Sequence, residues 1–305
     1  MRRLLLWMAA NRFLRRNLPR LWVTRRAVRK FMPGERVEDA LRAADRFAAK
    51  GIGILFTRLG ETLAQDGDAA QVADHYAELI DEIERRGLDG ELSVKPTHLG
   101  LDFGLDVATE HTAMLVRRAA PRTVWLDMEG SQYTEPTLEL YERLKREHEN
   151  VGLCLQAYLK RTYLDFERLE PLAPRIRLVK GAYAEPSDVA WQRRSEVDAN
   201  YLALCVSMLE AKRGGVDVFL GLGTHDVRLI EQVADHAKAV GLPKSAFDVE
   251  MLYGIRADQQ RRLLKQGYRV RVLIAYGEAW YPWYMRRLAE RPANVVFAVR
   301  QLLPF

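Results

Sequence analysis

The sequence predicts an α/β fold, a (β/α)8 TIM-like barrel with leading N-terminal helices. Short apolar runs rich in Val, Ile and Leu recur eight times and alternate with longer segments of helical period. Continuous apolar runs of this length are typical of strands covered on both faces, and strand–helix alternation implies a parallel sheet. Eight such repeats in about 250 residues match a barrel. The competing architecture is a doubly wound open sheet, but no G-x-G-x-x-G motif follows the first run.

A basic segment precedes the barrel. Residues 1–34 hold ten Lys or Arg residues and no acid, whereas the other 271 residues carry 37 basic and 41 acidic groups. The net charge of +6 therefore comes from this segment, and the body is mildly acidic. Pro33 and Gly34 predict a break before a helix over Val37–Lys50. We divide the chain into a basic N-terminal helical arm, residues 1–45, and a barrel domain, residues 46–305.

The arm has three interpretations: a nucleic-acid arm, a membrane-surface segment, or a basic helix packed on the body. The apolar run Leu4–Ala10 is too short to span a membrane. Trp7 and Trp22 among the basic residues favour peripheral contact with an anionic membrane surface. The acidic body and the lack of a recognition motif argue against nucleic acid.

The expected barrel elements follow in chain order. The strands are expected at Gly51–Phe56, Leu92–Lys95, Val124–Met128, Val151–Leu155, Ile176–Val179, Val216–Leu220, Ala246–Met251 and Val270–Ala275. Helices are expected at Ala69–Arg86, Leu105–Arg118, Thr137–Glu147, Val227–Val240 and Ala257–Lys265. The first of these helices places Val72, Tyr76, Leu79, Ile80 and Ile83 on one apolar stripe.

The carboxyl ends of the strands are where a barrel carries its active site. Lys95, Asp127 and Lys180 stand at or just after the ends of apolar runs, where a charge is costly unless it is paired or bound to a ligand. Structural ion pairs would give the same pattern. Arg286 and Arg287, followed one turn later by Glu290, suit bidentate capture of a carboxylate or phosphate, although such a doublet is also typical of a solvated helix face.

Several chemistries are excluded by missing motifs. The chain has no G-x-x-x-x-G-K-[ST] loop, no G-x-S-x-G elbow and no H-E-x-x-H pair. Its six histidines lack ligand spacing, so we expect no metal site. Its two cysteines, Cys154 and Cys205, are expected to be buried thiols.

An ordered set of short strings resembles the proline dehydrogenase family, and the compact length resembles its short, monofunctional bacterial type. The strings span roughly residues 30–300, and they are Pro33-Gly34-Glu35, Leu59-Gly60-Glu61, Ser93–Thr97, Leu126–Glu129, Gln156–Leu159, Arg177–Tyr183, Val197–Tyr201, Gly223–Asp226, Met251–Ile255 and Arg286–Pro292.

The resemblance implies FAD at the carboxyl end of the barrel, with a proline-like substrate stacked on the flavin. Asp127 and Arg177 would be catalytic, the first shaping the pocket and the second lying near the flavin N5. The substrate would be bound by Lys95, Tyr183, Leu273, Arg286, Arg287 and Glu290. The cofactor would be bound by Met128, Gln156, Arg177, Lys180, Gly181, Ala182, Thr224 and His225.

One position departs from the family pattern. Leu273 stands where the family commonly has a tyrosine that packs on the substrate ring, with its hydroxyl near the aspartate matched by Asp127. We therefore expect Asp127 to lack a partner, which is expensive for a buried carboxylate. A water, or a polar group of another substrate such as hydroxyproline, would take the place of the tyrosine. The other outcome is that Leu273 simply packs there and proline remains the substrate.

The resemblance also implies a quinone as the acceptor of the electrons, and hence a visit to the membrane. We expect a cytoplasmic protein that contacts the inner face of the cell membrane peripherally through its basic arm, without nucleic acid as a partner. A non-catalytic barrel that keeps only the fold is the alternative, and the polar residues at the strand ends argue against it.

Overall fold

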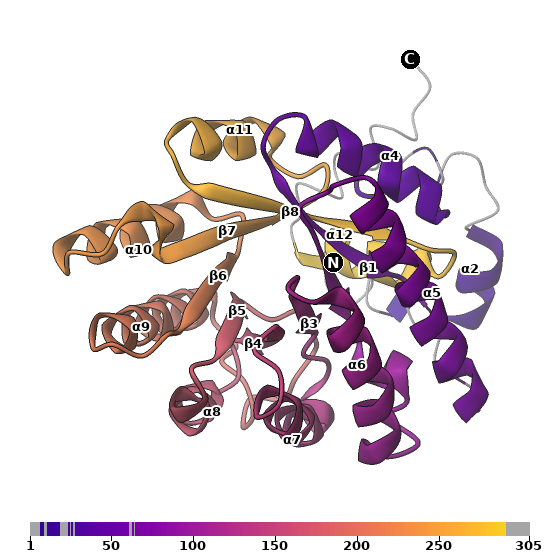
Figure 1. The fold of residues 1–305 in the computed structure, drawn as a ribbon, viewed down its shortest axis with the longest axis horizontal. Coiled ribbons are helices and arrows are strands. Elements are labelled where there is room, and N and C mark those ends of the chain that lie inside the picture. The colour runs from indigo at the N-terminus through magenta and orange to yellow at the C-terminus, as the bar shows by residue number, and fades with distance from the viewer. Residues whose placement is uncertain are drawn as a thin grey trace.

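The protein forms a closed barrel of eight strands in the order β1 to β8, and every neighbouring pair is parallel (Figure 1). The structure is a computed structural model that describes residues 7–8, 11–18, 24, 26, 28–60, 63 and 65–290. The predicted fold class is confirmed. Trp22 and Glu61 lie outside the described residues.

The strands agree with the predicted positions except for one. Their bounds are β1 Gly53–Arg58, β2 Gly90–Val94, β3 Val124–Leu126, β4 Val151–Gln156, β5 Arg175–Val179, β6 Phe219–Gly223, β7 Phe247–Leu252 and β8 Arg269–Tyr276. The strand predicted at Val216–Leu220 begins three residues later, so the predicted bounds of that strand were wrong. Gly221 and Gly223 weaken the strand signal, yet both pair with β5 and β7.

The helices form the outer ring of the barrel. Their bounds are α4 Val37–Ala48, α5 Asp66–Arg85, α6 Leu105–Ala119, α7 Thr134–Lys145, α8 Thr162–Leu169, α9 Arg194–Arg213, α10 Val227–Ala239, α11 Ala257–Lys265 and α12 Trp280–Glu290. Helices α8, α9 and α12 were not among the predicted helices. The buried residues of α9 nevertheless recur at helical spacing, at Tyr201, Leu204, Cys205, Met208 and Leu209.

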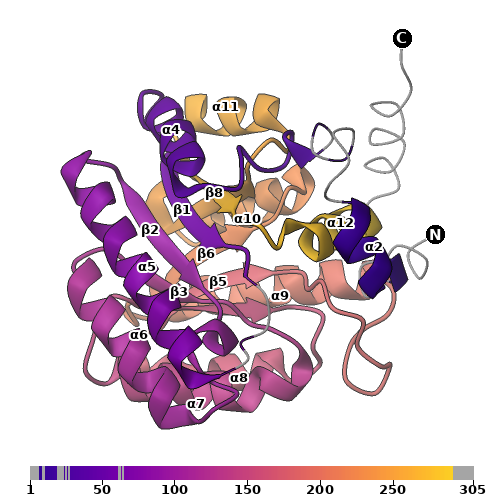
Figure 2. The ribbon, with the colours of Figure 1, turned by 90° about the vertical axis from the view of Figure 1, so that its right-hand side faces the viewer.

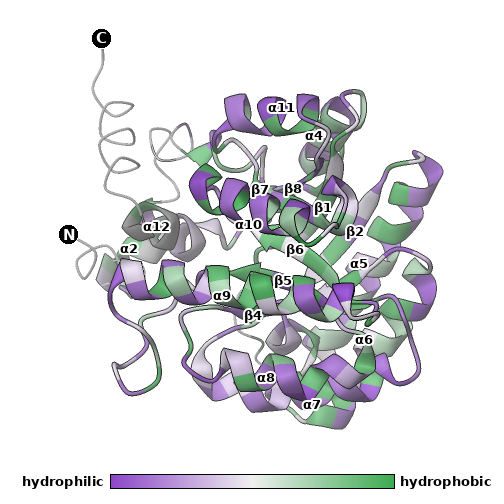
Figure 3. Cartoon of the chain, turned by 90° about the vertical axis from the view of Figure 1, so that its left-hand side faces the viewer, coloured by the Kyte–Doolittle hydropathy of each residue, from purple (hydrophilic) through white to green (hydrophobic). Residues whose placement is uncertain are grey.

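The apolar core lies between the strands and the helices. Ile54 and Phe56 of β1 belong to this layer, and so do Val272 and Ile274 of β8. Figure 3 shows apolar residues gathered along β4, β5 and β6, whereas the helices carry polar residues on their outer faces. Because side chains alternate along a strand, the residues between these positions point into the barrel.

The barrel interior is polar and charged at its base. Arg271 of β8 lies 3.3 Å from the Asp248 carboxylate of β7 and 3.5 Å from the Glu91 carboxylate of β2. The indole of Trp125 donates a hydrogen bond of 2.7 Å to Glu91. Gly152 of β4 stands opposite Trp125 in the sheet, and a Cβ atom there would lie 2.4 Å from the ring. The absent side chain at Gly152 is what lets a tryptophan fit inside the barrel.

The N-terminal arm packs beside the last helix. Helix α2, Arg12–Asn17, lies next to α12 in two views (Figures 2 and 3). Val28, Phe31 and Met32 form one apolar cluster with residues of α12, and Met8, Leu14 and Leu18 pack against it. Trp280 also donates a hydrogen bond of 2.9 Å to Glu35. The two ends of the described chain thus share a small core of their own, which we call the arm–α12 cluster.

The division at residue 45 stays a prediction, and α4 runs across it without interruption. In the described part of the chain, no helix is long and apolar enough to cross a membrane.

Candidate active site

Asp127 lies at the carboxyl end of β3 and is surrounded by hydrogen-bond donors. Ser93 of β2 donates a hydrogen bond of 2.6 Å to its carboxylate. Arg177 of β5 reaches across the barrel, donating to the Asp127 carboxylate and, at 2.9 Å, to the Ser93 hydroxyl. The Lys95 ammonium lies 3.4 Å from the other carboxylate oxygen. The structure thus brings together three predicted site residues, Lys95, Asp127 and Arg177.

These neighbours decide the charge of Asp127. Burial alone would raise the pKa of its carboxyl group, but the positive charges of Lys95 and Arg177 outweigh burial and lower it. Asp127 is therefore an anion at neutral pH. The expectation that it lacks a partner was wrong, because Ser93, Lys95 and Arg177 all donate to its carboxylate.

Leu273 occupies the expected place on β8. It pairs with Leu55 of β1 and Leu252 of β7 in the sheet and is half-buried. This wall of the barrel is therefore aliphatic. A hydroxylated substrate would find no side-chain hydrogen-bonding group at Leu273 itself.

A second carboxyl group lies beside Arg177. Glu250 of β7 is 4% exposed, and one of its oxygens lies 3.6 Å from Arg177 Nη1. The sequence reasoning drew nothing from this residue, and it also missed Ser93. The signal for Ser93 was available, because Ser93 and Lys95 are two residues apart and face the same side of one strand.

Gln156 ends β4 and carries an unused acceptor. Its amide nitrogen donates a hydrogen bond of 3.2 Å to the Met128 carbonyl. Its amide oxygen is buried and accepts no hydrogen bond from any residue that the structure describes. Such an orphan acceptor is rare in a folded protein, and a bound ligand is one explanation for it.

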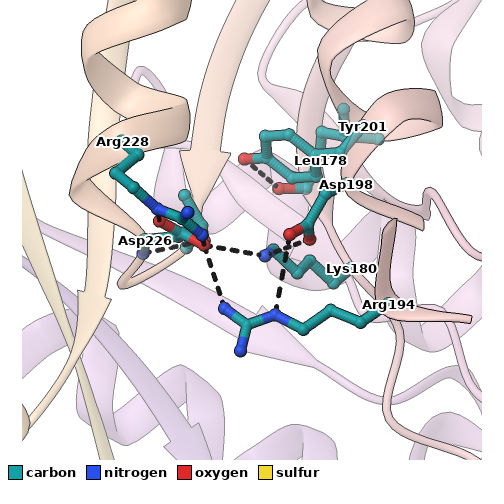
Figure 4. A network of polar contacts seen from close by, with 8 residues as sticks. Leu178, Lys180, Arg194, Asp198, Tyr201, Asp226 and Arg228 are labelled. Carbon is teal, nitrogen blue, oxygen red and sulfur yellow. Dashed lines mark hydrogen bonds and ion pairs between the residues drawn. The ribbon is translucent and has the colours of Figure 1, made fainter. Parts of the chain in front are cut away.

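Lys180 follows β5 and joins a network of charges (Figure 4). It pairs with the carboxylates of Asp198 and, at 3.2 Å, of Asp226. Arg194 lies 3.2 Å from Asp226 and 3.6 Å from Asp198, and Arg228 lies 3.4 Å from Asp226. Burial opposes the ionisation of Asp226, yet Arg228 and Lys180 lower its pKa to about 2.

This network carries an excess positive charge. Three cations share two carboxylates, and the Arg194 and Arg228 side chains are 72% and 77% exposed. An exposed cationic cluster beside a strand end is a suitable site for anionic groups such as phosphates. Sequence reasoning assigned no role to Arg194 or Arg228, because nothing in their local spacing indicates that α9 and α10 bring them together.

The backbone after β5 needs a glycine. Gly181 has a φ of 109°, and a Cβ atom there would lie 2.2 Å from the Tyr158 ring. Ala182 follows it, and Tyr183 packs against a small cluster that contains Tyr158 and Leu159. These residues form a fixed turn at the carboxyl end of the barrel.

Thr224 and His225 follow β6. The Thr224 hydroxyl accepts a hydrogen bond of 3.2 Å from the Asp226 backbone. The Nε2 atom of His225 accepts a hydrogen bond of 3.4 Å from the Leu252 backbone N–H, which places the ring proton on Nδ1 when the imidazole is neutral.

The remaining predicted residues lie on α12, which follows β8. Arg286, Arg287 and Glu290 belong to this helix, but their side chains lie outside the described part of the structure. Across the residues that are described, no group of three or more His, Cys, Asp or Glu side chains is arranged to hold a metal ion.

A closed barrel with buried charges at the carboxyl ends of its strands defines a (β/α)8 enzyme. Residues 40–300 match the family described as proline dehydrogenase. The chain belongs to the proline dehydrogenase family.

Curated relatives cover the chain almost end to end. It is 35% identical over 309 residues to proline dehydrogenase 1 of Bacillus subtilis (strain 168), covering 99% of each chain. It is 36% identical over 281 residues to the proline dehydrogenase of Deinococcus radiodurans, covering 90% of this chain and 89% of that one.

Solved structures agree on the fold. Proline utilization A (PutA) from Bdellovibrio bacteriovorus superimposes with a TM-score of 0.80 at 23% identity. The match covers 87% of this chain and 32% of that one, so the chain spans about a third of that larger protein.

Proposed function

We propose that the chain oxidises L-proline to 1-pyrroline-5-carboxylate in proline catabolism, with FAD as its cofactor and a quinone as the electron acceptor. The observation that carries the proposal is the cluster of Lys95, Asp127 and Arg177 at the carboxyl end of the barrel, in a chain that matches the proline dehydrogenase family over residues 40–300. When bound, FAD supplies the acceptor for the hydride that leaves the substrate.

The residues at the strand ends fit a flavin dinucleotide. The orphan amide oxygen of Gln156 suits a donor on the flavin ring system. The positive network of Lys180, Arg194 and Arg228 suits the pyrophosphate. The turn at Gly181 and Ala182, with Met128, Thr224 and His225, would line the cofactor between these two places.

Arg177 and Asp127 act on charge and orientation. Arg177 carries a fixed positive charge in a buried position, where it would stabilise electron density arriving on the flavin. Asp127 holds the Arg177 and Lys95 side chains in place through the contacts described above. Lys95, Arg286 and Arg287 would grip the substrate carboxylate, with Glu290 orienting the arginines and Tyr183 closing the pocket. The ring nitrogen must be neutral, because its lone pair forms the C=N bond as the neighbouring carbon loses a hydride, so the rate should rise with pH.

A proline analogue such as hydroxyproline is the second candidate substrate, and Leu273 favours it. Its side chain leaves the wall near Asp127 without the tyrosine hydroxyl that is common in the family. Ser93, Lys95 and Arg177 all donate to the Asp127 carboxylate. This weakens the alternative, because Asp127 does not need a hydroxyl group of the substrate as a further donor.

Anaerobic bleaching of the flavin separates the two substrates. The purified protein should be yellow, and the chromophore released from it by denaturation should be FAD. Titration with L-proline should bleach the oxidised flavin absorbance at lower concentration than trans-4-hydroxy-L-proline does. A bound flavin that responds only to hydroxyproline would reject proline and support the analogue. A colourless protein that does not take up added FAD would contradict the whole proposal. The Leu273→Tyr variant should shift the preference further toward proline.

We also propose that the arm brings the enzyme to the inner face of the cell membrane, where a quinone is reached. Trp7 and Phe13 are 58% and 72% exposed, in the segment that holds most of the excess positive charge. Exposed aromatic residues in a basic segment favour anionic lipid surfaces.

Vesicle sedimentation tests this contact. Deletion of residues 1–30 should abolish association with anionic vesicles, but it also removes Val28 from the arm–α12 cluster. The double variant Trp7→Ser and Phe13→Ser keeps that cluster and should weaken association strongly as well. Vesicles of zwitterionic lipid are the control. Unchanged sedimentation of both variants with anionic vesicles would exclude the proposed contact.

A further inference from the structure

Glu250 is a buried carboxyl group without a hydrogen bond. Neither of its oxygens has a hydrogen-bond partner among the residues that the structure describes. The side chain occupies space provided by β6, because a Cβ atom on Gly221 would lie 2.3 Å from Glu250 Oε1. A carboxyl group in such surroundings is held by the barrel wall and by charge alone.

The nearest cation is Arg177, which stands between two acids. Its Nη2 atom donates to Asp127 and Ser93, whereas its Nη1 atom lies 3.6 Å from Glu250. A distance of 3.6 Å is an ion pair and not a hydrogen bond. A small tilt of the planar guanidinium toward β7 would bring Nη1 within hydrogen-bond distance of Glu250 and would lengthen the contact with Asp127.

The other charges around Glu250 oppose one another. Glu91 of β2 and Asp248 of β7 disfavour its ionisation, and Arg271 of β8 favours it. Arg271 is already engaged by Asp89, Glu91 and Asp248. The phenol of Tyr201 on α9 interacts electrostatically with Glu250, and the thiol of Cys154 on β4 interacts with Arg177. Burial raises the pKa of Glu250 to about 7, even though Arg177 acts to lower it. Both the charged and the neutral form are therefore populated near neutral pH.

We infer that Glu250 is a positioning residue whose protonation state governs how Arg177 divides its contacts between Glu250 on β7 and Asp127 at the carboxyl end of β3. The ionised form attracts Nη1 away from Asp127, and its negative charge offsets the positive charge that Arg177 presents to the site where the flavin would lie. The protonated form leaves the guanidinium to Asp127 and to that site. The inference rests on the proposed function only in placing a flavin there.

The flavin midpoint potential reports this charge. Reduction adds negative charge to the flavin, and a nearby cation makes reduction easier. The wild-type potential should therefore fall more steeply with pH near pH 7 than on either side, when measured from about pH 6 to about pH 8. Glu250→Gln keeps the shape and cannot ionise, so its potential should follow pH without the steeper segment.

Asp248→Asn is the matched control. It removes one buried carboxylate from the same strand, but Asp248 contacts Arg269 and Arg271 and not Arg177. Its potential should keep the steeper segment but at lower pH, because Asp248 disfavours ionisation of Glu250. A Glu250→Gln curve that retains the steeper segment, or its loss in Asp248→Asn, would overturn the inference. If Glu250→Gln fails to fold, Gly221→Ala serves instead, since it displaces the carboxyl group without removing it and should move the steeper segment along the pH axis.

A measurement without flavin separates this inference from the proposed function. The Arg177 guanidinium resonances of the protein should shift with pH around pH 7, and the shift should vanish in Glu250→Gln. Arginine resonances that do not move in this range would refute the coupling even if proline bleaches a bound flavin. A pH-dependent shift in a protein that fails to oxidise proline would leave the coupling standing and reject the substrate.

Discussion

Replacing Gly152 by alanine should destabilise the barrel far more than a single methyl group suggests. The new Cβ atom would lie 2.4 Å from the Trp125 ring, and its nearest contacts are ring carbons and not a flexible chain end. Trp125 is fully buried, and its indole N–H is fixed by the 2.7 Å hydrogen bond to Glu91. The ring cannot move aside without giving up that bond.

The magnitude follows from these two contacts. Overfilling a packed core costs about 1–3 kcal/mol. Losing a hydrogen bond to a charged acceptor costs a further ~1.5–3 kcal/mol. We therefore expect the free energy of unfolding to fall by about 3–5 kcal/mol. With a urea dependence of about 3 kcal/mol per molar, the unfolding midpoint should drop by about 1 M or more.

Urea unfolding followed by circular dichroism measures this change. Gly67→Ala is the control, because Gly67 lies in α5 and a Cβ atom there meets nothing within 4 Å. That variant should be neutral or slightly more stable, since alanine favours a helix over glycine. A Gly152→Ala midpoint equal to that of the wild type would refute the reasoning that the glycine exists to admit the tryptophan.

Three further predictions concern titratable groups. Glu250→Gln should gain stability relative to the wild type as pH rises from 4.5 to about 7, by up to about 3 kcal/mol, and the difference should stay constant above pH 7. The reason is that native Glu250 still holds a proton in this range, whereas the unfolded chain has released it. Urea midpoints across this range measure the difference. His75 and His98 should both titrate near pH 4 instead of 6.5, because burial lowers their pKa values. The stability that depends on these two histidines should therefore fall as pH drops from 6.5 to 4 and change no further below that. Imidazole resonances that titrate near 6.5 in the folded protein would contradict this. Cys154 and Cys205 should resist a thiol reagent at pH 8 in the native state, since burial raises both thiol pKa values, and both should react after unfolding.

The order of strands and helices could be predicted from local pattern alone. Apolar runs and helical stripes depend on burial of neighbouring residues, which the sequence displays directly. β6 was misplaced because Gly221 and Gly223 look like loop residues, whereas Gly221 is in the strand to make room for a glutamate from β7. That reason is a contact between strands, and no local pattern contains it.

The site was predictable in its members and not in its connections. Lys95 and Asp127 stood out as charges at strand ends, Arg177 was implied by the family resemblance, and the structure brings the three together. The partners of Asp127 were predicted incorrectly, because reasoning from one missing tyrosine overlooked a serine two residues from Lys95. The joining of Arg194 and Arg228 around Asp226 requires the three-dimensional arrangement of two helices.

The arm–α12 cluster has a thermodynamic consequence. α12 carries Arg286 and Arg287, and it shares its buried face and the Trp280–Glu35 hydrogen bond with the arm. If the position of one depends on the other, occupancy of a lipid surface by the arm and occupancy of the substrate site by a carboxylate are linked quantities. Such linkage is reciprocal: whatever factor the membrane applies to substrate affinity, the substrate applies to membrane affinity. Where that factor is greater than one, bound substrate would favour the proposed membrane contact of the arm.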